Sequence, residues 1–253
     1  NADFLFENIS SLDAATIATT RNSFECTNES PIVGGISAPT SQELKYRAYG
    51  AFSSQNRAVT VQDYQALIYN MPPMFGAVKR ANVIRDPDSN KRNLNIYVLS
   101  EDNNRNLTNS NQILKNNIKT WISQYKMLND TIDILDGRIV NIGIEFEIMS
   151  DVGASKFEVL QRAKQELSAE MTTVQYDMGE PFRISDVLRT LKNTEGVLDV
   201  ISVRVFRRTG GLYSTFFYNL DANLTPDGRL INIPENAAFE LKIPNADIIG
   251  TIR

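Results

Sequence analysis

The sequence contains no histidine and a single cysteine, and these two shortages exclude most of the common catalytic chemistry. Across 253 residues no imidazole can act as a base near neutral pH, activate a serine or cysteine nucleophile, or bind a metal ion. Cys26 has no second cysteine with which to form an internal disulfide or a thiolate zinc site. Most hydrolase templates therefore fail, and only an enzyme that relies on carboxylates or lysine remains possible.

Long apolar runs and a strong net charge are missing as well. No stretch approaches the roughly 20 apolar residues that a membrane-spanning helix needs. Lys and Arg number 26 against 30 Asp and Glu, so the net charge of −4 supplies no field that would hold a polyanion at physiological salt. We expect neither a membrane span nor bulk nucleic-acid binding. The composition, 42% hydrophobic and 22% charged, is typical of a globular protein with a substantial core.

Capping residues and apolar periodicity predict the helices. Thr40 and Glu43 form a capping box before a helix over 41–53. Thr60 and Asp63 repeat this signal before a helix that Pro72 and Pro73 end. Further helices are predicted over 109–128, from Ser155 to about 167, and over 185–193. The apolar residues with helical spacing are Leu44, Ala48, Ala51 and Phe52 in the first helix, and Leu114, Ile118, Trp121, Tyr125 and Leu128 in the 109–128 helix, whose stripe must be buried.

Alternating and continuous apolar segments predict the strands. They cover 77–85, 94–99, 131–135, 139–149, 197–206 and the aromatic segment 213–218. Turn residues from Asp86 join the first two strands, and Asp136–Gly137 favours a tight hairpin between the next two. Two blocks share a short helix, a glycine and a strand, with Gly76 in the first and Gly196 in the second. We therefore expect two related helix-to-strand units.

The predicted class is α+β, with helices packed on mainly antiparallel β-hairpins. The expected divisions are an extended N-terminal segment over 1–40, a first α+β unit over 41–135, a second over 136–208 and a β-rich C-terminal arm over 209–253. Two alternatives stay open for the arm. It either contacts another chain through its aromatic residues, or folds back and extends the sheet whose strand ends near Arg207.

Two sets of acidic residues resemble functional sites, and each has a simpler explanation. Glu145 and Glu147 point to one face of a strand, about 7 Å apart, which is a separation that the two carboxylates of a glycosidase could have. However, any strand with one solvent-exposed face shows the same alternation of polar and apolar residues. The spacing of Asp86, Asp88 and Asn90 matches the start of a calcium-binding loop. The pattern then fails, because the loop requires Gly at the position of Lys91 and Glu at the position of Tyr97. The paired glycines lack phosphate-loop spacing. We expect no catalytic residues, no metal ligands and no cofactor.

Arginine and aromatic residues near the C-terminus are the candidate interaction residues. Three arginines around Phe206 could bind phosphate locally or line a solvated strand face, but arginine and aromatic side chains are also enriched at protein interfaces. A protein interface is the better functional interpretation in a net-acidic chain. The predicted interface residues are Arg204, Arg207, Arg208, Tyr213, Phe216, Phe217 and Tyr218.

Several motifs between Gly34 and about residue 100 carry a family resemblance. They are Gly34–Gly35, the helix start Glu43-Leu44-Lys45, the segment from Arg57 to Tyr64, and Gly76 to Ala81. Together they resemble the baseplate J-like family of contractile phage tails, and within it the C-terminal portion of the T4-type wedge proteins. The resemblance weakens towards residue 206 and does not extend into the tail. Because the chain starts at Asn1, we also expect a missing N-terminal part.

The resemblance implies a structural subunit of the bacteriophage virion and not an enzyme. A protein of this kind is assembled in the host cytoplasm into the tail baseplate, pairs with itself as a homodimer to link neighbouring wedges into a ring, and contacts other wedge and sheath-initiating proteins. No nucleic acid, membrane or cofactor is implied. Two alternatives stay open, a carboxylate-dependent glycan hydrolase of the tail, and a sugar-binding adhesin that uses Trp121 or the aromatic residues from Tyr213 to Tyr218.

Overall fold

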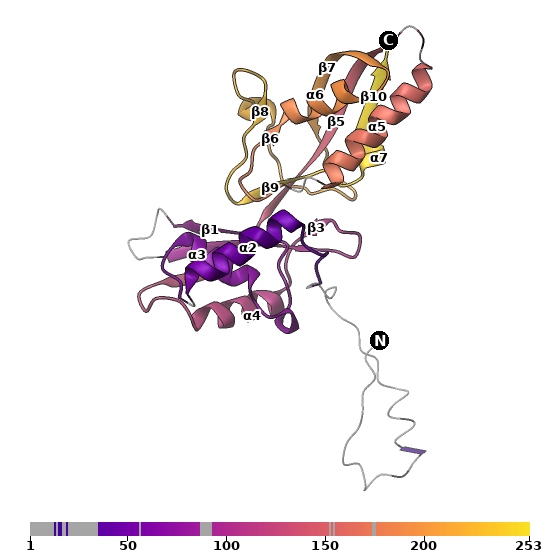
Figure 1. Ribbon diagram of the computed structural model, residues 1–253. Coiled ribbons are helices and arrows are strands. Elements are labelled where there is room, and N and C mark those ends of the chain that lie inside the picture. The colour runs from indigo at the N-terminus through magenta and orange to yellow at the C-terminus, as the bar shows by residue number, and fades with distance from the viewer. Residues whose placement is uncertain are drawn as a thin grey trace. The chain divides into compact units, whose positions relative to one another are not determined.

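The computed structural model describes residues 35–253 except 56, 87–92, 152, 154, 174 and 175, together with residues 13, 15, 16 and 19. The chain divides into two compact units, Asn1–Ile32 and Val33–Arg253. The second unit contains two four-stranded sheets with helices, so its class is α+β, as the sequence predicts (Figure 1).

The first sheet is built around β2 (Asn93–Glu101). β1 (Arg80–Arg85) pairs with it antiparallel, β4 (Thr131–Asp136) pairs with it parallel, and β3 (Leu107–Thr108) pairs with its last two residues. The associated helical elements are α2 (Ser41–Ser54), α3 (Val61–Tyr69), the short η1 (Pro73–Phe75) and α4 (Gln112–Ser123). Tyr64 of α3, Ile96 of β2 and Ile118 of α4 are fully buried in one hydrophobic core.

The second sheet is built around β5 (Arg138–Ser150). β7 (Val197–Arg207) pairs with β5 antiparallel, whereas the C-terminal strands β9 (Ala237–Glu240) and β10 (Ile248–Ile252) pair with it parallel. Helix α5 (Lys156–Thr173) contacts β10, and α6 (Ile184–Asn193) contacts β7 (Figure 1). The remaining elements are the two-stranded sheet β6 (Phe182–Arg183) with β8 (Leu230–Ile231), the short η2 (Asp221–Asn223) and α7 (Pro244–Asp247).

The hairpin predicted at Asp136–Gly137 is wrong, because the two strands it should join belong to different sheets. β4 ends at Asp136 on the first sheet, and β5 begins at Arg138 on the second. A Cβ at Gly137 would lie 2.5 Å from Cε of Met178 and 2.8 Å from Cγ of Leu99. The glycine is therefore needed for close packing where the chain crosses between sheets, not for a two-residue turn.

The helix predicted over 109–128 is shorter, and its predicted stripe is confirmed except at Leu128. It ends at Ser123, so Leu128 lies beyond it and is 97% exposed. Leu114 and Ile118 of the predicted stripe are buried in the core, together with Ile122, and Trp121 and Tyr125 are partly buried against it. Trp121 is half-buried and donates its indole N–H to the carbonyl of Leu67 at 2.9 Å, which joins α4 to α3.

Two helix-to-strand units do recur, and each has a glycine at the same place. Gly76 stands between α3 with η1 and β1, and has a φ of +100°. Gly196 stands between α6 and β7, and has a φ of +90°. Residues with a Cβ are strained in this backbone region, so both connections depend on glycine.

The C-terminal segment folds back onto the chain, which is the second of the two alternatives for it. β9 and β10 lie beside β5, and Phe239 is buried with its ring 6.1 Å from that of Phe182. The strand predicted over 213–218 is wrong, because this segment has no β pairing. Its tyrosines are instead anchored by side-chain bonds, from Tyr213 to the carboxylate of Asp247 and from Tyr218 to the carbonyl of Asn232.

The first prediction concerns the helix-to-strand unit of α3. The side chain of Thr60 accepts from the N–H of Asp63, whose carboxylate accepts from the N–H of Thr60. Thr60→Ala should lower the free energy of unfolding by about 1 kcal/mol through loss of this cap, and Gly76→Val by about 1 kcal/mol or more through strain at positive φ. Urea denaturation measures both, with the exposed Gln62→Ala of the same helix as control. Parent-like stability in both variants would show that the unit is misplaced.

The second prediction tests the fold-back of the C-terminal segment. Phe239→Ala removes a buried aromatic ring from the core of the second sheet, so the free energy of unfolding should fall by about 3–5 kcal/mol. Phe217→Ala removes a ring that is 70% exposed, and should cost less than about 1 kcal/mol. Both are measured by denaturant unfolding of the full chain. If truncation at residue 210 left a fully cooperative and equally stable protein, the fold-back arrangement would be refuted.

Candidate interaction surfaces

The acidic pair on β5 lies on a solvated face of the second sheet. Glu145 is exposed and stands directly opposite Arg204 in the register of β5 and β7. Glu147 forms an ion pair with Arg253, with 2.5 Å between Oε1 of Glu147 and Nε of Arg253. Glu145 is therefore paired in register with a cation on β7, and Glu147 with a cation that directly follows β10. Opposite charges on adjacent strands are typical of a solvent-exposed sheet face.

Metal and membrane sites find no support in the described part of the chain. Among these residues no three acidic, histidine or cysteine side chains are grouped so that they could hold a metal ion. Asp88 and Asn90 of the calcium-like segment lie outside the described residues, while the N–H of Asp86 bonds to the carbonyl of Asn93 at the start of β2. The helices that the structure describes are too short or too polar to cross a membrane.

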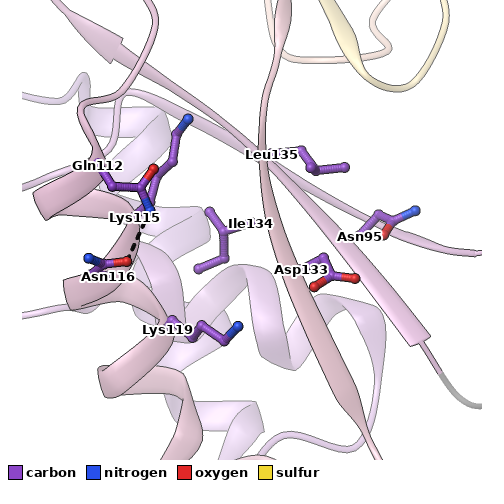
Figure 2. A pocket seen from close by; sticks show the side chains of 8 residues that line it. All are labelled: Asn95, Gln112, Lys115, Asn116, Lys119, Asp133, Ile134 and Leu135. Carbon is purple, nitrogen blue, oxygen red and sulfur yellow. Dashed lines mark hydrogen bonds between the residues drawn. The ribbon is translucent and has the colours of Figure 1, made fainter.

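A polar hollow of about 260 Å³ lies between α4 and the strands β2 and β4 (Figure 2). Nζ of Lys115 is 2.7 Å from the carboxylate of Asp136, and Gln112 donates to Asn116 at 3.1 Å. Lys115, Gln112 and Asn116 of its lining therefore have polar partners within the chain. The lining residues are Asn95, Gln112, Lys115, Asn116, Lys119, Asp133, Ile134 and Leu135.

Lys79 and Arg80, at the start of β1, form two buried ionic networks. Nζ of Lys79 lies 3.3 Å from the carboxylate of Glu101 and donates to Oγ of Ser37, which itself donates to Glu101. The Arg80 guanidinium is 4% exposed and contacts the carboxylates of Glu43 and Asp177, each at 2.9 Å. Arg80 thereby connects α2 and the first sheet to the segment before β6.

These contacts alter the ionisation of Glu43. Partial burial by itself would raise the pKa of this carboxyl, but the N–H of Thr40 and the Arg80 guanidinium both stabilise the charged form. The net effect is a pKa below its ordinary value of 4.5. Glu43 therefore caps α2 and holds it to Arg80 in the same ionised state.

Most of the predicted interface residues make contacts inside the chain. Nε of Arg208 is 3.0 Å from the buried Asp247, which also accepts from Tyr213 at 2.6 Å. Phe216 packs at 6.4 Å from the ring of Tyr218 and beneath the guanidinium of Arg138. These four side chains, Arg208, Tyr213, Phe216 and Tyr218, thus help to attach the C-terminal segment to the second sheet.

The other three predicted interface residues are more accessible. Arg204 is exposed on β7, and Phe217 is 70% exposed with the guanidinium of Arg207 stacked 4.3 Å from its ring centre. The structure brings Arg207 and Phe217 together as one surface pair. Their use as an interface remains a prediction.

A larger apolar surface lies on α2, and the sequence assignment of interface residues missed it. Leu44 is 53% exposed, Tyr46 72%, Tyr49 75% and Phe52 85%. The opposite side of the helix packs inward through Arg47, whose guanidinium lies 4.8 Å from the ring centre of Tyr69, and through Gly50. The helical spacing of Leu44, Ala48 and Phe52 indicated an apolar helix face in the sequence. Spacing alone does not say whether that face packs against the rest of the chain or is exposed.

Comparison with known proteins shows a shared fold. No protein-family model and no curated protein matches the chain. A solved structure is similar, a chain in the cryo-EM structure of the baseplate of the anti-feeding prophage, refined with six-fold symmetry. The TM-score is 0.50 and the sequence identity 16%, over 81% of this chain. This chain spans 42% of the length of the chain that it matches. The similarity shows that this chain shares a fold with a chain of that structure.

The third prediction follows from the ionised state of Glu43. A carboxyl whose pKa is lower in the folded than in the unfolded protein stabilises the fold above the unfolded pKa and loses this contribution as pH falls through the folded value. Glu43→Gln should therefore be less stable than the parent at pH 7, and the difference should shrink below about pH 4. Chemical denaturation at pH 7, 5 and 3 measures it. Equal destabilisation at pH 7 and pH 3 would contradict the ionic role.

Proposed function

We propose that this chain is a non-enzymatic structural subunit of a contractile-tail baseplate. The observation that carries the proposal is the fold, which matches a baseplate chain over 81% of the residues. Motifs between Gly34 and Ala81 support a position in the baseplate wedge, because they resemble the baseplate J-like family and the C-terminal portion of T4-type wedge proteins. Such a subunit resides in the virion tail and is assembled in the host cytoplasm.

The chemistry of the surface agrees with an assembly role. Two of the less exposed lysines form ion pairs inside the chain, Lys79 with Glu101 and Lys115 with Asp136. Exposed aromatic side chains such as Phe52 and Phe217 are instead suited to protein contact, because aromatic residues are enriched at interfaces. We infer that the chain pairs with itself to link neighbouring wedges and contacts other wedge and sheath-initiating proteins.

Neither alternative function has a supporting arrangement. A glycan hydrolase would need Glu145 and Glu147 to flank a substrate cleft, but they stand beside Arg204 and Arg253 on an open sheet face. A sugar-binding adhesin would use Trp121 or the aromatic residues from Tyr213 to Tyr218. Trp121 packs edge-on against Tyr125 and bonds to Leu67 within the chain. Tyr213 and Tyr218 also bond within the chain, to Asp247 and Asn232.

The fourth prediction places the protein in the particle. Gold-labelled antibodies raised against this chain should mark the baseplate end of intact tails in electron micrographs, and particles lacking the protein should fail to close a baseplate. Antibodies against a sheath protein of the same particle, which mark the whole tail length, serve as the control. Label confined to the sheath or the fibre tips would refute the proposal.

The enzymatic alternative is tested on the same material. Purified chain incubated with host cell walls should release no soluble glycan, and neither should Glu145→Gln or Glu147→Gln. A turnover that either substitution abolishes would replace the structural proposal with the hydrolase.

A further inference from the structure

Helix α2 is held on one side only. Towards α3, a Cβ at Gly50 would lie 3.0 Å from Cβ of Ala66, and the Arg47 guanidinium stacks on Tyr69. At its first turn Glu43 binds Arg80. These contacts fix the orientation of the helix and determine which side chains point outward.

The outward side carries an apolar stripe, defined here as Leu44, Ala48, Tyr49 and Phe52, with Tyr46 beside it. With 3.6 residues per turn, the four positions fall within about 140° of the helix circumference. All four are exposed. An apolar stripe of this width ordinarily faces a core, so the stripe on α2 needs a partner that the chain itself does not supply among its described residues.

The stripe differs from the other exposed apolar side chains. Ile113 and Phe157 are strongly exposed but stand singly on their helices, which is common on protein surfaces. On α2 the exposed groups follow one another on successive turns of one helix. Clustering of this kind marks a contact surface.

We propose that the α2 stripe pairs with the same stripe of a second copy, with the two helices antiparallel about a two-fold axis between Ala48 and Tyr49. This rests on the proposed function, which requires a contact repeated by symmetry. In that register each Tyr49 lies opposite the small Ala48 of the other copy, and each Phe52 lies opposite Lys45. Large groups thus meet small ones, and an ammonium meets an aromatic ring.

The self-complementary order of these residues favours a second copy as the occupant. Lys45 is not part of the stripe as defined, but it lies between Phe52 and Tyr49 on the helix circumference and adds a positive charge there. A parallel pair would place the two Lys45 side chains against each other, whereas the antiparallel pair separates their backbones by roughly 10 Å along the axis, at 1.5 Å per residue. A two-fold pair requires only that one surface match itself, and this stripe does so.

The exposed area is large enough for a modest dimer. With about 200 Å² for each aromatic side chain, the exposed fractions of Tyr46, Tyr49 and Phe52 and the smaller share of Leu44 sum to roughly 550 Å² per copy. A pair would bury about 1,100 Å², just above the area of roughly 1,000 Å² that a specific interface needs. We therefore expect association at micromolar concentration.

Sedimentation of the full chain tests the proposal. The parent should sediment as a dimer at about 10–100 µM, and Phe52→Ser and Tyr49→Ser should each weaken dimerisation at least tenfold. Both side chains are exposed, so the melting temperature should stay close to that of the parent. Phe157→Ser, which removes a similarly exposed ring on α5, should leave the dimer intact. A dimer unaffected by both α2 substitutions would overturn the proposal.

Cysteine cross-linking tests the orientation. In a Cys26→Ser background, Ala48→Cys should form an interchain disulfide on oxidation, because the two copies meet near the axis, whereas Lys45→Cys should not. Efficient cross-linking through Lys45→Cys would overturn the antiparallel register. If the parent chain stays monomeric at 100 µM, self-pairing is overturned. This outcome is separate from the proposed function, because gold labelling could still place the chain in the baseplate, and a different protein would then cover α2.

Discussion

Strand β5 is the element on which the C-terminal half of the fold depends, because each of β7, β9 and β10 pairs directly with it. Its inward side chains Ile142, Ile144, Phe146 and Ile148 are at most 1% exposed. Burial of such side chains contributes roughly 1.5–3 kcal/mol each before chain entropy is subtracted. The partners of β5 come from distant parts of the sequence, and all of them bond to β5 and share its core. Removal of any one partner would leave part of β5 without its hydrogen bonds and would expose part of that core.

Arg80 has a comparable linking role, because it joins α2 and the first sheet to the segment before β6. Its buried guanidinium contacts the carboxylates of Glu43 on α2 and of the more exposed Asp177, and its Nε–H also donates to the carbonyl of Tyr176. A buried charge is tolerated when its partners satisfy it, and loss of one partner leaves an unpaired charge. The position of α2, and with it the direction of the apolar stripe, therefore depends on an ionic contact on the opposite side of the helix.

The described surface combines internal ion pairs with exposed aromatic side chains. Lys79 pairs with Glu101 and Lys115 with Asp136, whereas aromatic groups on α2 and at Phe217 are exposed. The similarity of fold to a chain of a baseplate structure and these exposed aromatic groups are independent observations that support the proposed function.

The sequence by itself determined much of the local structure, although the strand over 213–218 and the end of the helix over 109–128 were wrong. The capping boxes at Thr40 and Thr60, the helix over α6, and the glycines 76 and 196 follow from interactions within a few residues, and all are present. Such signals do not depend on the rest of the chain. The α+β class followed from the same local patterns.

Only the tertiary structure decided which strands pair and which helix face is buried. Asp136–Gly137 has the chemistry of a hairpin, yet packing of Leu99 and Met178 leads the chain from one sheet into another. The stripe of α2 has helical spacing, but the contacts of Arg47 and Gly50 turn it outward. Both outcomes depend on residues distant in sequence, whose contacts arise only on folding, and periodicity along the chain contains no information about them.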